Sequence, residues 1–447
     1  MFAWLLSALL FSWGFARAAD NPFPKVAEIN LNERLIAMGE APLESMSVWA
    51  VSFSPDSSRL AIEFGEPDDR VIVSGVHPRP TPNRYLLIVP SASPQSTIHG
   101  IKLTKLGFAN RAPLVGGPPF TELRWAPDGD ALWYETVLIR FPGLDACRIP
   151  GGLLGFVGPA TALTTVGHPG AELRRELSTG PRPITVLGVM DFQCQILEKL
   201  ATKLPIMLAA VSSDTRFLTT EAPNLNAPPG SGLSHTGDLI LARLAYAELA
   251  SPADPLRTMA RHTPDDALPS KQLPIEGRLR IHLADTYVRN TVFLEDAVCS
   301  LLQEPRAGQS LAQPPPHSPF EELEAQQPRP YANRNLRMRI FCWDTKTGKR
   351  IRESKALWSR SAVPMSTGSG RIAIGDDGWP AVNPDPAAPR LHTIWDFKNG
   401  QVMAEWSPEL GQGPGTELGA RVGFAISPDG HLIAEGGVHS VRIYRLP

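Results

Sequence analysis

The sequence has no large excess of charge of either sign. In 447 residues, 43 lysines and arginines nearly balance 45 aspartates and glutamates, so the formal net charge is −2. A protein that holds a polyanion through its overall electrostatic field needs a basic surplus. The composition therefore predicts that the chain does not bind nucleic acid.

Motifs that carry known chemistry are also missing. The sequence contains no Gly-x-Ser-x-Gly, no His-Glu-x-x-His and no glycine-rich phosphate loop. These absences exclude the local signatures of α/β-hydrolases, zinc proteases and P-loop enzymes. The cysteines lack the close spacing of a metal site, and Ile374–Gly378 offers an adjacent acidic pair instead of the alternating acids of a calcium loop. We predict no cofactor and no metal.

The ten histidines are scattered. His392, His431 and His439 lie beside predicted strands, and three such side chains that met at one face would hold a metal. We interpret them instead as ordinary surface or turn histidines. Trp379, next to Pro380 in a predicted loop, is the tryptophan we most expect to be exposed. It either faces a sugar or peptide ligand, on which its ring stacks, or packs locally.

Long apolar runs are absent after the amino-terminal one. That run, Phe2 to Phe15, is followed by Ala16-Arg17-Ala18, the arrangement of a secretory signal peptide and its cleavage site. We predict that residues 1–18 are removed and that residues 19–447 are secreted or periplasmic, without stable membrane insertion. An uncleaved anchor is the alternative, although a run of about 15 residues is short for a bilayer.

Only four cysteines are present. Cys147 and Cys194 form one pair, Cys299 and Cys342 a second at similar spacing, and the first member of each follows similar text, "TVLIRFPGLDAC" and "TVFLEDAVC". We predict two disulfides of matching placement, 147–194 and 299–342, as an oxidising compartment permits. Four cysteines allow three pairings, and four buried free thiols are the alternative.

Proline, by contrast, is abundant, with 45 residues, which disfavours long helices and favours turns. Three stretches share one plan: an alternating strand, Ser/Ala-Pro-Asp, and a second apolar strand. They are Trp49–Phe64, Glu122–Val137 and Gly423–Gly437. A weaker copy lies at Met207–Glu221, around Asp214, and we interpret Ser369–Val382 as a distorted copy that turns at Asp376.

The turn residues of these copies have distinct roles. Proline presets φ at the first turn position, aspartate accepts a backbone hydrogen bond, and glycine adopts the left-handed conformation. Because Ser57 stands where the other copies have glycine, we expect the first hairpin to close with a slightly different turn. The predicted turn residues are Pro55 and Asp56; Pro127, Asp128 and Gly129; and Pro428, Asp429 and Gly430.

A second recurring text, at Met338–Leu357 and Leu391–Trp406, predicts a strand, Trp-Asp, a polar turn with glycine, and another strand. The combined unit has four antiparallel strands, and its repetition with variable insertions is typical of a β-propeller. Trp343-Asp344, Trp395-Asp396 and the three Pro-Asp turns resemble WD40-like and related bacterial propeller repeats. The Gly-His dipeptide of that family is missing before each Trp-Asp.

We therefore predict an all-β fold, a single propeller of six or seven four-stranded blades. Six units are identified, and a seventh fits around 141–185 or 255–335. The last unit has three strands, and we expect an amino-terminal strand, Val26–Leu31, to supply the fourth and close the ring. The six units are 47–105, 120–203, 205–251, 275–358, 361–408 and 420–447.

Function follows less directly, because propellers support both enzymes and docking proteins. Two Pro-rich insertions, near 221–237 and 301–335, are either recognition loops or plain spacers. We predict a non-catalytic, monomeric exported propeller that binds a protein or peptide. The alternative is a hydrolase-type enzyme with its site at the central channel, for which several acids or histidines must line that channel.

Overall fold

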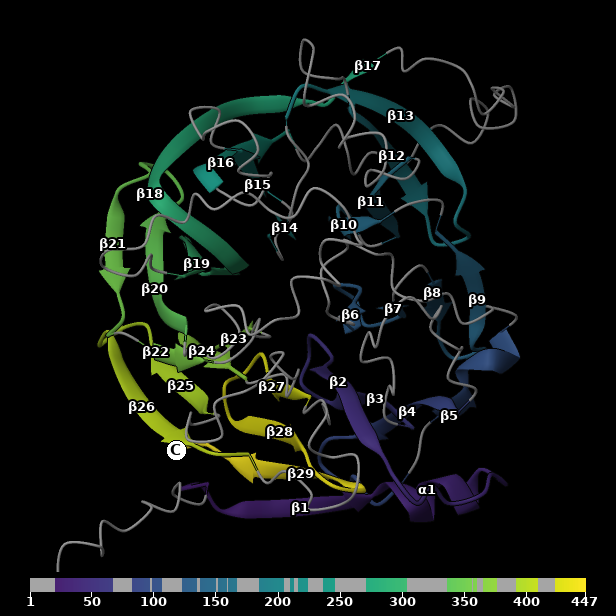
Figure 1. Ribbon diagram of the computed structural model, residues 1–447. Helices are drawn as coiled ribbons and strands as arrows, with labels where there is room; N and C mark the ends of the chain where they lie inside the picture. The colour runs from purple at the N-terminus through teal and green to yellow at the C-terminus, as the bar shows by residue number, and fades with distance from the viewer. Residues whose placement is uncertain are drawn as a thin grey trace, which may run out of the picture.

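The structure is a computed structural model, and its strands form a ring of seven blades around a central axis, a seven-bladed β-propeller (Figure 1). The first strand of each blade lies nearest the axis, and the fourth lies at the rim. The structure describes residues 21–66, 83–96, 99–106, 123–134, 137–149, 152–158, 160–166, 185–204, 210–212, 216–223, 236–245, 271–303, 336–355, 357–359, 365–375, 391–408 and 423–447.

Blades 1 to 3 are sheets of consecutive antiparallel strands. Blade 1 contains β2 (Ser47–Phe53), β3 (Arg59–Gly65), β4 (Arg84–Pro90) and β5 (His99–Lys102), followed by the short 3-10 helix η1 (Leu103–Leu106). Blade 2 contains β6 (Leu123–Trp125), β7 (Ala131–Tyr134), β8 (Val137–Arg140) and β9 (Asp145–Arg148). Blade 3 contains β10 (Leu153–Phe156), β11 (Thr161–Thr165), β12 (Thr185–Asp191) and β13 (Ile196–Thr202).

Blades 4 and 5 share one long strand, β18 (Ile275–Leu294), which joins them into an eight-stranded sheet. The short strand β17 (Lys271–Gln272) pairs with β13 in parallel, and β22 (Leu357–Ser359) pairs with β20. Blade 4 contains β14 (Ala210–Val211), β15 (Phe217–Pro223), β16 (Thr236–Leu244) and the first part of β18. Blade 5 contains the rest of β18 with β19 (Ala297–Gln303), β20 (Leu336–Asp344) and β21 (Arg350–Glu353).

Blades 6 and 7 complete the ring. Blade 6 contains β23 (Met365–Gly368), β24 (Arg371–Ile374), β25 (His392–Asp396) and β26 (Gln401–Trp406). Blade 7 contains β27 (Phe424–Ile426), β28 (Leu432–Gly436), β29 (Ser440–Arg445) and, from the other end of the chain, β1 (Lys25–Asn30).

The closing strand confirms the sequence-based prediction. β1 pairs antiparallel with β29, with Ile29 opposite Val441, so the last blade gains its fourth strand from the amino-terminal region. The strand ends one residue earlier than predicted because the Asn30 side chain accepts hydrogen bonds from the backbone of Asn32 and Glu33. Those bonds cap α1 (Leu31–Ala37), since the first amides of a helix lack internal partners.

The blade count also has a clear explanation. The predicted unit 120–203 contains two blades, so the seventh lies in the first of the two intervals considered. The predicted unit 275–358 begins too early. Residues 275–286 pair with β16 and belong to blade 4, and only the later part of β18 begins blade 5.

Apolar side chains hold neighbouring blades face to face. Between blades 7 and 1, Leu60, Ile62 and Phe64 pack with Ala434 and Ile443, and all five are fully buried. Complete burial of each large side chain contributes about 1.5–3 kcal/mol to stability.

No helix in the described part of the chain combines the length and the apolar character needed to cross a membrane.

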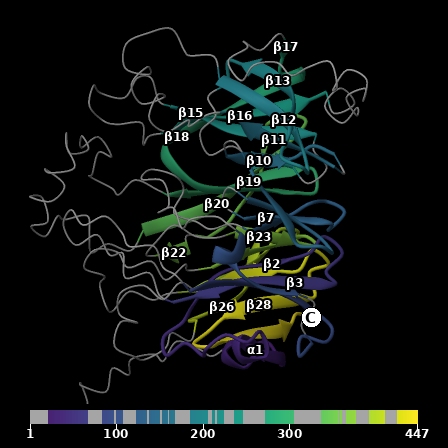
Figure 2. The same ribbon diagram turned by 90° about the vertical axis from the view of Figure 1, so that its right-hand side faces the viewer.

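The strands run between two edges of the ring (Figure 2). At one edge the first strand of a blade turns into the second. In blade 6, for example, Ser369-Gly370 forms the turn between β23 and β24. We call this the turn edge. At the opposite edge, which we call the connection edge, the second strand ends and the third begins, as β3 and β4 do in blade 1.

Candidate functional site

The predicted Pro-Asp turns lie at the turn edge, where they join the first two strands of blades 1, 2 and 7. The aspartate accepts the bonds that shape each turn. Asp56 Oδ1 accepts from Ser54 Oγ at 2.5 Å and from the backbone N of Ser58 at 3.1 Å. These hydrogen bonds lower the pKa of Asp56 from 3.8 to about 2. Asp429 has the same pattern, with Ser427 Oγ at 2.5 Å and the His431 N at 3.0 Å.

The third turn position takes the left-handed conformation in all three copies. Its φ is 78° at Gly129, 76° at Gly430 and 60° at Ser57. Each of these residues donates its backbone N–H to the residue three positions earlier. The expectation that the first hairpin closes differently was wrong, because the turn's hydrogen bonds hold Ser57 in the conformation that glycine adopts more readily.

One other predicted turn needs correction. In blade 6 the hairpin turns at Ser369 and Gly370, with φ of 45° and 78°, and not at Asp376. Asp376 follows β24 and lies outside the described residues. The acidic text "GDDG" suggested a Pro-Asp-like turn, whereas a two-residue turn with both φ values positive suits a tight hairpin.

At the turn edge, neighbouring blades are bonded to each other. Arg59, the first residue of β3, donates from Nη2 to the carbonyl of Gly129 in blade 2 at 2.8 Å. Arg371, the first residue of β24, donates to the carbonyl of Gly430 in blade 7 at 2.7 Å and to that of Pro447 at 2.8 Å. Two arginines at equivalent positions thus attach one blade to the next blade's turn.

The turns themselves also touch. The backbone N of Ser369 donates to the carbonyl of Pro428 at 3.1 Å, and the backbone N of Asp429 donates to Ser57 Oγ at 3.2 Å. These bonds connect blades 6, 7 and 1. At the turn edge, these described polar groups therefore help to hold the ring together.

The connection edge contains a buried acid between blades 1 and 2. Glu63 is fully buried near the end of β3 and forms an ion pair with Arg84, the first residue of β4. Tyr134, at the end of β7, donates its hydroxyl to Glu63 at 2.9 Å. The Arg84 guanidinium also lies 5.1 Å from the ring centre of Trp49 and 5.5 Å from that of Tyr134. An aromatic enclosure thus stabilises a buried cation.

A second buried acid lies between blades 6 and 7. Glu435 Oε2 accepts from Trp406 Nε1 at 3.1 Å and from Asn21 Nδ2 at 3.3 Å. His392 Nε2 lies 3.9 Å from Glu435 Oε1, and the His392 ring stacks on Phe424 with 4.1 Å between ring centres. Burial lowers the pKa of His392 from 6.5 to about 3. This histidine is therefore neutral near neutral pH.

The three histidines considered as metal ligands do not meet. His392 is buried at the connection edge, His431 follows the Pro-Asp-Gly turn at the opposite edge, and His439 lies between β28 and β29. Within the described ranges, no three histidine, cysteine or acidic side chains are placed to hold a metal ion.

The inner strands decide which chemistry the channel can offer. Their described residues include no aspartate, glutamate or histidine in any of the seven blades. Arg124 in β6 is engaged, since it donates to the carbonyl of Leu154 at 3.1 Å and lies over the Trp133 ring. The inner strands are Ser47–Phe53, Leu123–Trp125, Leu153–Phe156, Ala210–Val211, 287–294, Met365–Gly368 and Phe424–Ile426.

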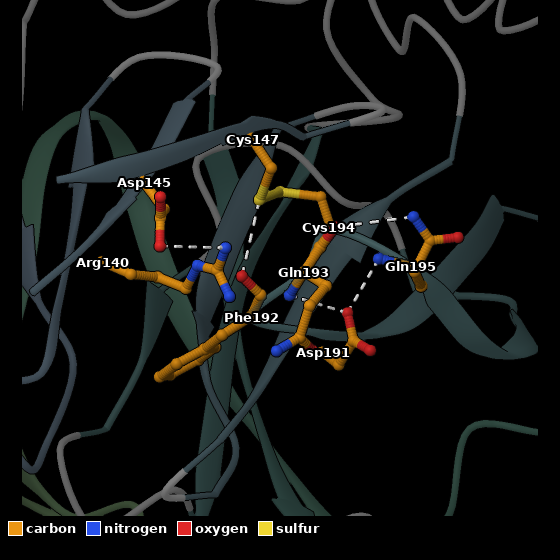
Figure 3. Close-up of a disulfide and its surroundings, with 8 residues drawn as sticks. All are labelled: Arg140, Asp145, Cys147, Asp191, Phe192, Gln193, Cys194 and Gln195. Carbon is orange, nitrogen blue, oxygen red and sulfur yellow. Dashed lines mark hydrogen bonds and ion pairs between the residues drawn. A yellow bond between two sulfur atoms is a disulfide. The ribbon is translucent and has the colours of Figure 1, made fainter. Parts of the chain in front are cut away.

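Both predicted disulfides are present, but their placements do not match. Cys147 in β9 and Cys194, in the turn before β13, are half-buried and link the rims of blades 2 and 3 (Figure 3). Cys299 and Cys342 are opposite each other on neighbouring strands of blade 5 and are fully buried. One bridge thus joins two blades, and the other lies within one sheet.

Several predicted features lie outside the described residues. They include the signal peptide, Trp379, and most of the insertions near 221–237 and 301–335. Sequence reasoning missed the two buried acids. A signal existed, because Glu63 and Glu435 interrupt the apolar runs "RLAIEFG" and "HLIAEGG", and a charge inside a buried strand requires a partner.

The comparisons with known proteins give no family. No family model and no curated protein matches the chain. One similar solved structure is Kuenenia stuttgartiensis hydrazine synthase, with a TM-score of 0.49, 12% identity, and 90% of this chain and 97% of that chain covered. A chain of a mitotic checkpoint complex has a TM-score of 0.44 and 10% identity, with 96% of each chain covered. Kluyveromyces lactis Hsv2 has 0.43 and 10%, with 88% and 90% covered.

Proposed function

We propose that this chain is a non-catalytic, exported propeller that binds a protein or peptide at its connection edge. The observation that carries the proposal is the composition of the described inner strands, which have no acid or histidine. A catalytic site at a channel mouth needs groups that take up or release protons. Without them the described lining favours docking over hydrolysis.

The difference between the two edges supports the choice of surface. At the turn edge, Arg59, Arg371 and the turn backbones are engaged with neighbouring blades. At the connection edge, Glu63 and Glu435 link blades from below the surface, since both are buried. Among the described residues, these links at the connection edge do not use exposed groups such as Val438, which supports a partner contact at this edge.

Export rests on two further observations. The apolar run and the small-x-small site of residues 1–18 fit a signal peptide, and two disulfides fit an oxidising compartment. The monomeric state stays a prediction.

The test is a matched pair of photo-crosslinking variants. One carries p-benzoylphenylalanine at Val438, a 38% exposed residue between β28 and β29 at the connection edge. The other carries it at Lys398, an exposed residue between β25 and β26 at the turn edge. Each protein is expressed in its native host, irradiated, and recovered from the exported fraction.

We expect a discrete crosslinked partner from the position 438 variant and none from the position 398 variant. Crosslinking from position 398 alone would place the binding surface at the turn edge and contradict the proposal. Recovery of no partner from either position, together with turnover of a small substrate by the purified protein, would show that the chain is an enzyme instead.

A further inference from the structure

The long strand β18 has an unpaired edge at the rim of blade 4. Over Ile275–Leu283 it pairs with β16 on one side, and no described strand pairs with its other side. In Figure 1 this part of β18 follows the outside of the ring before the strand turns inward to begin blade 5. An unpaired strand edge presents backbone donors and acceptors that can pair with another chain.

Contacts at the rims of three other blades partly cover or tie down their outer strands. β17 pairs with part of the outer edge of β13 in blade 3. In blade 7, the Gln95 side chain donates to the carbonyl of Glu28 on β1 at 2.9 Å. The disulfide of Cys147 ties β9 in blade 2 to the next blade. No such device blocks Ile275–Leu283 within the described residues.

Side chains alternate along this part of β18. Ile281 and Leu283 face the core that blades 4 and 5 share and are buried. Arg278, Arg280 and His282 alternate with them and are exposed, with side-chain exposures of 69% for Arg280 and 81% for His282. Glu276 begins the same alternating set and is also exposed. After it, Arg278, Arg280 and His282 form a basic row with a period of two residues, which is the period of any extended chain.

A buried acid fixes two members of the row. Asp238 in β16 has a side-chain exposure of 10%, accepts from Arg280 Nε at 2.6 Å, and lies 3.1 Å from His282 Nδ1. Arg243 pairs with Glu276 at 3.0 Å. Arg278 has no carboxylate partner in the described part of the chain, so its charge is available to an external acid.

We propose that an extended acidic segment of a partner protein adds as a further strand to the free edge of β18. Its backbone pairs with Ile275–Leu283, and its alternate acidic side chains lie along the basic row. Main-chain pairing gives affinity and the row gives selectivity, as in other cases of strand addition. The inference deepens the proposed function and rests on it, since it names the chemistry of the partner and a second contact surface.

The probe is a fluorescent peptide of about eight residues, within the usual strand length, with glutamate and valine in alternation. Its binding to the full chain is followed by fluorescence anisotropy at low ionic strength, where surface charges are weakly screened. The variant is Arg278→Glu. The matched control is Arg148→Glu, which changes an exposed arginine on β9, the outer strand of blade 2.

Two further peptides separate strand pairing from charge attraction. One carries N-methyl groups at the odd positions and the other at the even positions, so each has lost its backbone donors on one edge. A peptide that pairs through one edge must lose affinity in one of the two forms only.

We expect saturable binding that weakens tenfold or more with Arg278→Glu, changes less than twofold with Arg148→Glu, and is lost for one N-methylated peptide. Equal binding by the Arg278→Glu protein would overturn the proposed site. Equal binding of both N-methylated peptides, or equal competition by a heparin fragment, would show a general anion surface and overturn strand addition. In each case the crosslinking test at position 438 still decides the proposed function separately.

Discussion

The two edges of the ring are held together in different ways. At the turn edge, neighbouring blades are linked through groups at the surface: Arg371 donates to the Gly430 carbonyl at 2.7 Å, and the turns contact each other directly. At the connection edge the described links lie in the interior, where the buried Glu63 of blade 1 accepts from Tyr134 of blade 2 at 2.9 Å. In the described part of the chain, one edge thus links its blades through surface groups and the other through buried groups, and this difference is the basis of the proposed binding surface.

The largest effect is expected for Glu63→Ala, because it removes the buried link at the connection edge. Arg84 then remains in a buried site without its acid, and the free energy of unfolding falls by about 3–5 kcal/mol. Urea denaturation followed by tryptophan fluorescence measures the change. The control is Glu276→Ala, whose exposed pair with Arg243 is worth less than about 1 kcal/mol. Equal losses of unfolding free energy in the two variants would show that the buried interaction of Glu63 stabilises the fold no more than an exposed ion pair.

A smaller effect is expected at the turn edge for Gly430→Ala. A Cβ at this position would lie 2.7 Å from the Ser369 Cβ, and φ is 76°. Strain and the contact together should lower the free energy of unfolding by about 1–3 kcal/mol. Gly39→Ala is the matched control, since Gly39 has φ of 77° and a Cβ added there would have nothing within 4 Å. A loss at Gly39 as large as that at Gly430 would mean that the inter-blade contact contributes nothing.

Arg371→Ala tests the inter-blade bonds of the turn edge directly. It removes the bonds to the Gly430 and Pro447 carbonyls, and we expect a loss of about 1–2 kcal/mol. Thermal unfolding by circular dichroism provides the measurement. An unchanged melting temperature would show that these bonds form in the folded ring but do not stabilise it.

The smallest effect concerns acid. The folded-state pKa of Asp56 is about 2, below its ordinary value of 3.8, because the carboxylate accepts bonds within its turn. A lowered pKa stabilises the folded state at pH values above the unfolded-state pKa. This contribution is lost as the pH falls from 3.8 through the folded-state pKa of about 2. The difference in unfolding free energy between wild type and Asp56→Ala, about 1 kcal/mol at pH 6, should therefore shrink toward zero near pH 2. A difference that grew with acidity would contradict the assigned bonds.

The turn edge was largely predictable from sequence, because its chemistry is local. Pro428, Asp429 and Gly430 are adjacent, and each has one conformational role. The closing strand was predictable from alternation and from the missing fourth strand of the last unit. The seventh blade was less visible, because the hairpin between β10 and β11 lacks the Pro-Asp text.

The connection edge was much harder to predict. Glu63 pairs with Arg84, 21 positions away, on the neighbouring strand of the same blade. It also accepts from Tyr134, 71 positions away, and this bond forms only because the ring brings blades 1 and 2 together. A continuous apolar run such as that of β3 indicates that a strand is buried on both faces, but not which distant residue pairs with its acid. For the same reason the pairing of Cys147 with Cys194 was predictable while its position between two blades was not.

The most direct test of the division between the edges compares partner capture by two variants at equal folded concentration. Val438→Arg changes an exposed residue at the connection edge, and Arg371→Ala changes a link at the turn edge. We predict that Val438→Arg reduces capture at least tenfold with unfolding free energy unchanged, and that Arg371→Ala lowers stability with capture intact. Loss of capture in the Arg371→Ala protein, with full capture by Val438→Arg, would contradict the account.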